Sequence, residues 1–271
     1  MDRKIEINAA PSPREYQKIQ EFIFAASGIT LGPGKQAMVA GRLGKRLRAL
    51  GSSNYEDYLQ HLLRDPQEKQ LAVDLLTTNE TYFFREPKHF AFFSEKVIPE
   101  WNHLNKPRIW SAASSSGEEA FSIAMVLAER RGQRPWEIFA SDLSQSILQT
   151  AQAATYPLQR GEKIPKPYLQ RFCLKGIGSK EGTFQIDAAL RQRVQFHQIN
   201  LINPLPDLGE FDMIWLRNVL IYFNFDTKAA ICQEILQKLR PGGYFLVGHS
   251  ESLQGITSGL EMVQAAVYRK P

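Results

Sequence analysis

A run of small side chains that ends in two carboxylates is the first segment whose residue types indicate ligand chemistry. Residues 111–117 read Ser-Ala-Ala-Ser-Ser-Ser-Gly, and Glu118 and Glu119 follow them. Small side chains allow a ligand to approach the backbone closely at the carboxyl end of a strand. The run lacks the GxGxxG pattern and two carboxylates do not suit a pyrophosphate, whereas they suit a cation such as the ammonium of a methionine moiety. The alternative is a pair of solvated acids that stabilise a helix N-terminus.

Asp142 ends the next predicted strand. An acid at that place accepts hydrogen bonds from ribose hydroxyls in nucleoside-binding sheets. The alternative is a helix cap that Asp142 shares with Ser144. Together with the small-residue turn, Asp142 indicates a nucleoside cofactor. NAD and S-adenosylmethionine both fit this pattern, and the missing glycines disfavour NAD.

Arg85 and Tyr222 are candidates for contact with the group that reacts. Arg85 follows two phenylalanines, and an arginine in a shielded pocket can grip a carboxylate with two parallel hydrogen bonds. The alternative for Arg85 is a surface cation stacked on one of these rings. Tyr222 offers a hydroxyl a few residues after the strand-end pair Arg217-Asn218, where active-site loops gather in such sheets.

Positive charge is concentrated on the helix predicted over residues 34–50. On a helical wheel, one face of this helix carries Lys35, Arg42, Lys45 and Arg46. This face could dock an acidic protein target; the alternative is an ordinary solvated helix face.

Two patterns of elements position these residues. Residues 13–76 read as four helices without strands, which indicates a helical unit of its own. From Pro107 onward, strands alternate with helices, which predicts an α/β fold with a parallel, doubly wound sheet. Between Tyr156 and Gln195 this rhythm is interrupted by glycine turns and a short strand over residues 183–186. We interpret that segment as a small antiparallel insertion.

Composition excludes several classes of protein. The 271 residues are 43% hydrophobic and 23% charged, which are ordinary globular values. No run approaches the ~18–20 apolar residues of a membrane span, and Met1–Arg14 lacks the apolar region of a signal peptide. We therefore expect a cytoplasmic protein without membrane insertion. Two distant cysteines and five scattered histidines predict neither a disulfide nor a metal site.

Five motifs, in order along nearly the whole chain, resemble those of the CheR family of chemotaxis methyltransferases. They are Asn79-x-Thr81-x-Phe83-Phe84-Arg85, Trp110-Ser111-Ala112-Ala113-x-x-x-Gly117-Glu118-Glu119, Phe139-Ala140-Ser141-Asp142, Arg217-Asn218-Val219-x-Ile221-Tyr222-Phe223 and Gly248-His249-Ser250-Glu251. The resemblance implies a class I S-adenosylmethionine methyltransferase, with S-adenosylhomocysteine as its product. It implies a helical N-terminal domain over residues 1–76, a methyltransferase domain over residues 77–271, and a β-subdomain inserted at about 157–195.

The resemblance also assigns residues to the cofactor and the acceptor. Glu119, with Glu118 as a second candidate, would meet the methionine end, Asp142 the ribose, and Asn200-Leu201 the adenine. Arg85 and Tyr222 would face an incoming glutamate carboxylate and serve as the catalytic pair. The cofactor pocket would comprise Asn79, Thr81, Arg85, Glu118, Glu119, Asp142, Asn200, Leu201, Leu216, Arg217 and Asn218.

The partner that the resemblance implies is the cytoplasmic domain of a methyl-accepting chemoreceptor, docked by the basic helix. A C-terminal tether peptide of the receptor could pair with the β-subdomain by strand addition. A glutamate side chain has an ordinary pKa of about 4.3 and is ionised at neutral pH, so no general base is expected. Two alternatives are a nucleic-acid methyltransferase, suggested by the net charge of +5, and a catalytically silent binding protein. The first would carry an Asn/Asp-Pro-Pro-aromatic loop where Arg217-Asn218-Val219 stands, so nucleic acid is not expected as a partner.

Overall fold

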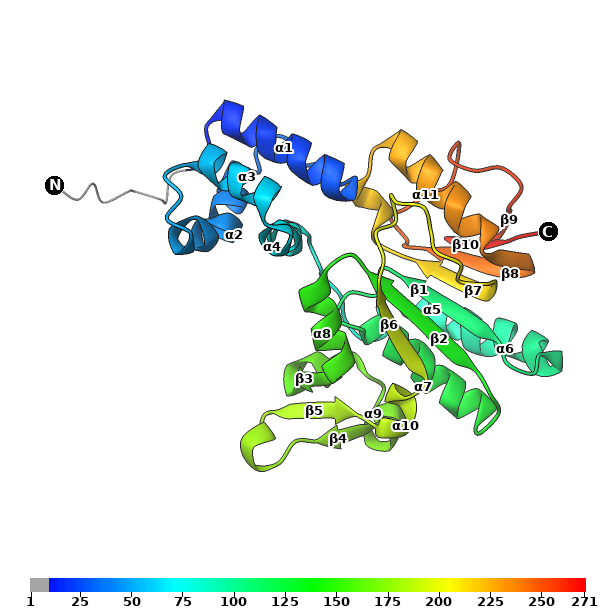
Figure 1. The fold of residues 1–271 in the computed structure, drawn as a ribbon. Coiled ribbons are helices and arrows are strands. Elements are labelled where there is room, and N and C mark those ends of the chain that lie inside the picture. The colour runs from blue at the N-terminus through cyan, green and yellow to red at the C-terminus, as the bar shows by residue number, and fades with distance from the viewer. Residues whose placement is uncertain (1–9) are drawn as a thin grey trace.

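The first four helices form a unit of their own, set to one side of the sheet (Figure 1). The computed structural model describes residues 10–271, so most of Met1–Arg14, on which the signal-peptide prediction was made, lies outside the described residues. The helices are α1 (Pro13–Ser27), α2 (Gln36–Ala49), α3 (Tyr55–Arg64) and α4 (Pro66–Leu76). Side chains of Ser12, Asn54 and Asp65 accept hydrogen bonds from backbone N–H groups at the starts of α1, α3 and α4. The apolar faces of the four helices meet in a separate core.

Two of the four basic residues predicted for docking, which lie on α2 or at its N-cap, have partners in the structure. The guanidinium of Arg42 donates to the carbonyl oxygens of Leu76 and Thr77, each at 2.8 Å. Arg46 forms an ion pair with Glu68, a carboxylate that is only 5% exposed. The helical wheel placed these arginines on one face of the helix, but it could not show that α4 packs against that face. Lys35 and Lys45 remain exposed.

The larger sheet has seven strands in the order β6-β2-β1-β7-β8-β10-β9. Its strands are β1 (Arg108–Ala112), β2 (Glu137–Asp142), β6 (Val194–Gln198), β7 (Phe211–Leu216), β8 (Leu239–Val247), β9 (Glu261–Gln264) and β10 (Val267–Arg269). The first five in this order pair in parallel, and the last two add an antiparallel edge. The predicted α/β fold with a doubly wound sheet is confirmed. The order reverses between β1 and β7, which is where ligands bind in sheets of this kind.

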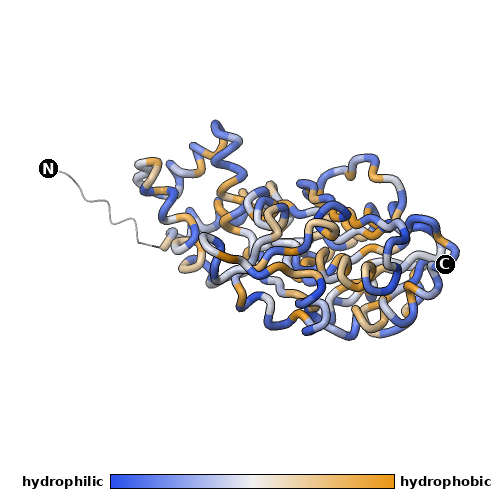
Figure 2. The backbone as a smooth tube through the Cα atoms, turned by 90° about the horizontal axis from the view of Figure 1, so that it is seen from below, coloured by the Kyte–Doolittle hydropathy of each residue, from blue (hydrophilic) through white to orange (hydrophobic). Residues whose placement is uncertain are grey.

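Helices cover both faces of this sheet (Figure 1). They are α5 (Pro87–Phe92), η1 (Phe93–Val97), α6 (Ile98–Glu100), η2 (Trp101–His103), α7 (Glu118–Arg131), α8 (Gln145–Ala153), η5 (Leu220–Tyr222) and α11 (Phe225–Gln237). Along β7, Met213 and Trp215 point into one core cluster while Ile214 and Leu216 point into the other. Figure 2 shows the hydrophobic residues gathered along these central segments and hydrophilic residues on the outer turns.

The insertion is a small three-stranded antiparallel sheet in the order β3-β5-β4. Its elements are β3 (Thr155–Pro157), η3 (Leu158–Lys163), α9 (Lys166–Phe172), β4 (Cys173–Lys175), η4 (Gly178–Lys180), β5 (Thr183–Ile186) and α10 (Ala188–Arg191). It begins two residues before the predicted 157, because Thr155 already pairs with Gln185. It ends before Val194, which pairs with Ile138 in the larger sheet.

Among the described residues, no helix combines the length and the apolar character that a membrane crossing needs.

The ion pair between Arg46 and Glu68 has a consequence for stability. Arg46→Ala should lower the free energy of unfolding at pH 7 by about 2 kcal/mol, because the buried carboxylate loses its cation. Burial alone raises the pKa of Glu68, but Arg46 and the Tyr58 hydroxyl lower it below its ordinary value of 4.5. A carboxyl with a lowered pKa stabilises the fold above its unfolded pKa and loses that effect as the pH falls. The difference between the two proteins should therefore shrink below pH ~4.5.

Urea unfolding of both proteins across pH 3–7 measures this difference, with Lys45→Ala as the control on the same helix. Lys45 is exposed, so its removal should change stability by less than ~0.5 kcal/mol. An equal loss in both variants, or a difference that does not change with pH, would contradict the assignment.

Candidate active site

A cavity lies at the carboxyl ends of β1, β2 and β7, beneath the segment that joins the helical unit to the sheet. Ten of the twelve residues predicted for the cofactor and the acceptor line it. They are Asn79, Thr81, Arg85, Glu119, Asp142, Asn200, Leu201, Arg217, Asn218 and Tyr222. These residues come from distant segments, which only the fold brings together.

Glu118 and Leu216 do not line the cavity, and their predicted place in the cofactor pocket is corrected. Glu118 is fully buried, accepts a hydrogen bond from Ser116 and pairs with Arg160 of the insertion. Consecutive helical residues point ~100° apart, so only one of the two adjacent glutamates can face the cavity. Leu216 points into the core on one face of the sheet, as the alternation along β7 requires.

The guanidinium of Arg217 joins two carboxylates at the floor of the cavity. Its side chain is 1% exposed, and its Nη1 and Nη2 lie 2.8 Å from Glu119 Oε2 and Glu86 Oε2. Nη2 also donates to the carbonyl oxygen of Arg85 at 2.6 Å, and the Ser111 hydroxyl donates to the other Glu119 oxygen at 2.7 Å. Two carboxylates to one guanidinium leave the floor of the cavity with an excess of negative charge.

Burial and the Arg217 charge act in opposite directions on these carboxyls. Burial raises the pKa of Glu119, and the contacts with Arg217 and Ser111 oppose that rise. Burial also acts to raise the pKa of Glu86, but Arg217, Asn218 and the backbone of His249 lower it to about 2. A cationic ligand group next to Glu119 would relieve the same penalty that burial imposes on its charged form.

Asp142 holds the turn after β1 and keeps capacity for further hydrogen bonds. Its two oxygens accept from the backbone N–H of Ser115 at 2.9 Å and of Ser144 at 3.0 Å. Burial raises the pKa of Asp142, and these backbone donors oppose the rise. The Ser144 hydroxyl accepts a hydrogen bond from Ile147 N and is the N-cap of α8. The alternative that Asp142 shares this cap is therefore not observed. A carboxylate oxygen accepts more than one hydrogen bond, so Asp142 can also receive ribose hydroxyls.

Backbone strain is concentrated around the cavity. Of seven non-glycine residues with a positive φ in the described chain, five lie in the segments that form or border it, namely Phe84, Glu86, Ala113, Ser115 and Asn218. Such conformations persist only where surrounding contacts fix them, and they cluster at ligand sites. Here the fixing contacts include a hydrogen bond from Phe84 N to the Ser122 hydroxyl at 3.0 Å and one from Asn218 N to Glu251 at 2.7 Å.

Arg85 and Tyr222 approach the cavity from the two segments predicted for the acceptor. Arg85 Nη1 donates to the carbonyl oxygen of Glu80 at 2.7 Å, and its guanidinium lies 5.8 Å from the centre of the Tyr82 ring. Its remaining N–H groups are available to a ligand. The stacking on a phenylalanine that the sequence left open is not observed, because both phenylalanines are buried. Burial raises the pKa of Tyr222, so its hydroxyl is protonated at neutral pH and can donate.

The insertion supports the segment that carries Arg85. The Phe83 ring meets Tyr156 edge-on at 5.1 Å, and the Phe84 ring stacks on Tyr168 at 5.4 Å. Arg160 donates to the carbonyl oxygen of Thr81 at 3.3 Å as well as pairing with Glu118. The position of Arg85 therefore depends on the packing of the small sheet.

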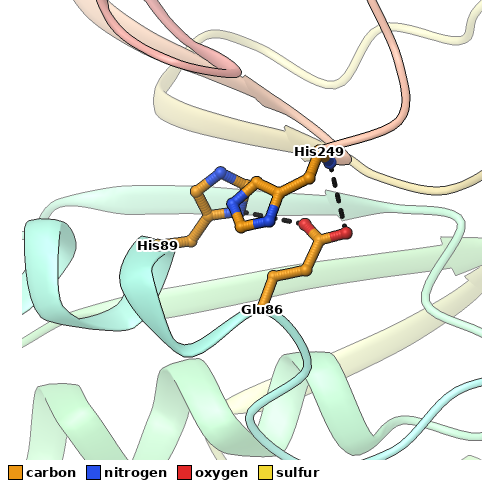
Figure 3. Close-up of side chains that lie close together, drawn as sticks. All are labelled: Glu86, His89 and His249. Atoms are coloured by element: carbon orange, nitrogen blue, oxygen red, sulfur yellow. Dashed lines mark hydrogen bonds and ion pairs between the residues drawn. The ribbon is translucent and has the colours of Figure 1, made fainter.

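Sequence reasoning missed three residues beside the cavity. Glu86, His89 of α5 and His249, which follows β8, lie together in Figure 3. The two imidazole centroids are 4.6 Å apart, so these histidines are scattered in the sequence but not in space. Burial, with the Arg217 charge, lowers the pKa of His89 to about 3, so its ring is neutral. The sequence signals were Glu86 next to Arg85 and the quoted motif that contains His249.

The residues of the cavity fit S-adenosylmethionine. Its ammonium and sulfonium suit the excess negative charge near Glu119, its ribose suits Asp142, and the small turn of residues 113–117 admits it close to the backbone. The strand order and this pocket define a class I S-adenosylmethionine-dependent methyltransferase.

Comparison with known proteins identifies the family. The family model described as CheR methyltransferase, all-alpha domain, matches residues 14–77, and CheR methyltransferase, SAM binding domain, matches residues 79–269. Chemotaxis protein methyltransferase 2 of Pseudomonas aeruginosa is 39% identical over 257 residues, covering 94% of this chain and 92% of its own. The chemotaxis protein methyltransferase of Salmonella typhimurium is 35% identical over 264 residues, covering 96% and 91%. The chain therefore belongs to the CheR methyltransferase family.

Among solved structures, the glycopeptide N-methyltransferase MtfA complexed with S-adenosyl-L-methionine is 17% identical, with a TM-score of 0.39, and the match covers 71% of this chain and 60% of that chain. A likeness at this level adds nothing to the assignment.

The two adjacent glutamates allow a matched test of the cofactor site. Glu119→Gln should raise the Kd for S-adenosylhomocysteine by about 10–100-fold, because a hydrogen bond to a charged group contributes about 1.5–3 kcal/mol. Glu118→Gln removes a neighbouring carboxylate that lies outside the cavity and should change the Kd by less than about threefold. Isothermal titration calorimetry measures both; equal effects, or an effect of Glu118→Gln alone, would refute the placement.

Proposed function

We propose that this enzyme transfers the methyl group of S-adenosylmethionine to glutamate side chains on the cytoplasmic domain of a methyl-accepting chemoreceptor. The product would be a glutamate methyl ester, as part of chemotaxis adaptation. The observation that carries the proposal is that Arg85 and Tyr222 line the same cavity as Glu119 and Asp142. The two relatives reported above are both chemotaxis protein methyltransferases, and their names support the class of acceptor.

The reaction needs positioning more than acid–base chemistry. When bound, S-adenosylmethionine supplies an electrophilic methyl group; the acceptor oxygen bonds to its carbon as the sulfur–carbon bond breaks, and no proton moves. A glutamate with an ordinary pKa of about 4.3 is already ionised at neutral pH, so no general base is required. Holding two reactants in line contributes as much as ~7–11 kcal/mol. The residues of this chain therefore act by orientation and by excluding water.

Arg85 and Tyr222 are the residues that we assign to the acceptor. The Arg85 carbonyl is held by Arg217 and its guanidinium by the Glu80 carbonyl, so its position is coupled to the cofactor floor. Its free N–H groups and the Tyr222 hydroxyl would orient the carboxylate oxygen toward the methyl group. An overly strong ion pair would stabilise the bound acceptor more than the transition state. One oriented arginine with a neutral hydroxyl would orient the carboxylate without binding it too strongly.

Docking would use two exposed lysines, Lys35 at the N-cap of α2 and Lys45 within it. Lys35 and Lys45 are exposed, and they carry the positive charge that we propose meets an acidic receptor surface. Arg42 and Arg46 of the predicted patch would act mainly by holding the helical unit together. In addition, β4 is an edge strand of the small sheet, with Leu174 56% and Ile177 84% exposed close by. We propose this edge as the place where a receptor tether peptide could add a strand.

Arg85→Ala should lower kcat for methyl transfer by about 100-fold, because the acceptor loses its orientation. Its Kd for S-adenosylhomocysteine should stay within about threefold of the wild-type value. Tyr222→Phe should lower kcat by about tenfold. Tritiated methyl transfer to receptor-containing membranes, followed by release of methanol in base, measures both the rate and the ester. Lys88→Ala, on the exposed side of α5, is the control; unchanged rates in Arg85→Ala, or label that base does not release, would reject the proposal.

Reversing both exposed lysines tests docking in the same assay. Lys35→Glu combined with Lys45→Glu should raise KM for the receptor and leave kcat and the Kd for S-adenosylhomocysteine unchanged. The effect should be larger at low salt, where surface charges are less screened. Lys96→Glu, an exposed lysine of η1, should have no such effect. A loss of cofactor affinity in the double variant would count against a docking role.

A further inference from the structure

Glu86, His89 and His249 bring three metal-ligating side chains together beside the active site (Figure 3). They come from the segment before α5, from α5 itself and from the loop after β8, and their ligand atoms all lie within 4.8 Å of one another. The two imidazole planes are inclined by 69°, in an edge-to-face arrangement rather than a stack.

His89 is the second, independent observation. Its side chain is 0% exposed, and neither Nδ1 nor Nε2 has a hydrogen-bond partner. Nδ1 lies 3.4 Å from Glu86 Oε2 without the geometry of a hydrogen bond. Buried polar atoms in folded proteins are nearly always paired, and an exception calls for an explanation such as an ion. A coordinated metal would satisfy one of these nitrogens.

We propose that Glu86, His89 and His249 form a binding site for a divalent transition metal of the zinc type. Two imidazoles and one carboxylate are ligands that zinc takes at four-coordinate sites with three protein ligands, where water occupies the fourth position. Magnesium and calcium prefer oxygen ligands, so two imidazoles select against them. The 3.4 Å between His89 Nδ1 and Glu86 Oε2 matches the separation of two ligands at ~2.0–2.1 Å from a tetrahedral ion. His249 is exposed and can turn to complete the site.

The metal would be coupled to the cofactor pocket through Glu86. The carboxylate of Glu86 already accepts from Arg217 Nη2 at 2.8 Å and from Asn218 Nδ2 at 3.1 Å, and both donors line the cofactor cavity. A dication on Glu86 would compete with Arg217 for this carboxylate. Arg217 would then pair more fully with Glu119, the proposed acceptor for the ammonium of the cofactor. Metal binding should therefore weaken cofactor binding, and cofactor should weaken metal binding by the same factor. The site would be inhibitory.

Titration of the full, untagged chain with Co²⁺ tests the site directly. Cobalt in a low-symmetry site with histidine ligands gives visible absorption, and zinc should displace it. We expect one equivalent to bind, and His249→Ala to weaken binding by at least about tenfold. His103→Ala, which removes another exposed histidine on η2, should bind like the wild type. Binding that is absent, or that is equally strong in His249→Ala, would overturn the site.

Calorimetry with S-adenosylhomocysteine tests the coupling. Saturating Zn²⁺ should raise the Kd for S-adenosylhomocysteine by at least about fivefold in the wild type and not in His249→Ala. An unchanged Kd in the zinc-loaded wild type would overturn the inhibitory role. Neither measurement uses an acceptor protein, so neither outcome depends on the proposed chemoreceptor substrate.

Discussion

The buried ion pairs of Arg217 with Glu86 and Glu119 are the interaction on which the rest of the site depends. This guanidinium connects the end of β7, the start of α7 and the segment that carries Arg85. Loss of one partner from a buried pair typically costs about 3–5 kcal/mol, because the other charge stays buried without compensation. The arrangement also sets the charge of the pocket: one guanidinium between two carboxylates leaves an acidic floor for a cationic cofactor.

Two outlying parts of the fold hold this centre in place. The helical unit reaches it through α1 and α4: Asn200 donates to the Ala26 carbonyl at 2.8 Å, and Asp74 accepts from Ser146 N at the start of α8 at 2.9 Å. The insertion reaches it through the aromatic contacts of Phe83 and Phe84 and through Arg160. The parts that we propose for receptor docking therefore also pack against the segments that position cofactor and acceptor.

Local signals in the sequence were enough to predict the elements and a nucleoside site at the strand ends, whereas the family resemblance supplied much of the list of pocket residues. Alternating strands and helices predicted the doubly wound sheet, and the small-residue turn and Asp142 predicted the strand ends at which the cavity lies. Local signals could not show which way a side chain points or which residue of another element it contacts. Glu118 and Glu119 are equivalent in type, and only the packing of α7 makes one face the cavity. Arg42 and Arg46 looked like a free basic face because their partners lie on α4.

The cluster of Glu86, His89 and His249 could not be predicted from local signals either, because His249 lies far from the other two residues in the sequence. Glu86 and His249 are 163 residues apart in the chain, yet the His249 backbone N–H donates to the Glu86 carboxylate at 3.2 Å. Local periodicity does not report contacts across such a separation, because they depend on how β1, β7 and β8 assemble. A charged residue beside a recognised motif, as Glu86 is beside Arg85, is the signal that could have found it.

A crystal structure of the complex with S-adenosylhomocysteine would test the arrangement of the cofactor pocket. The product should occupy the cavity at the ends of β1, β2 and β7, with its ammonium on Glu119, its ribose hydroxyls on Asp142 and its adenine beside Asn200 and Leu201. Arg217 should keep its contact with Glu119. A product molecule bound elsewhere, or bound here without contact to Glu119 and Asp142, would show that these residues do not form the cofactor site.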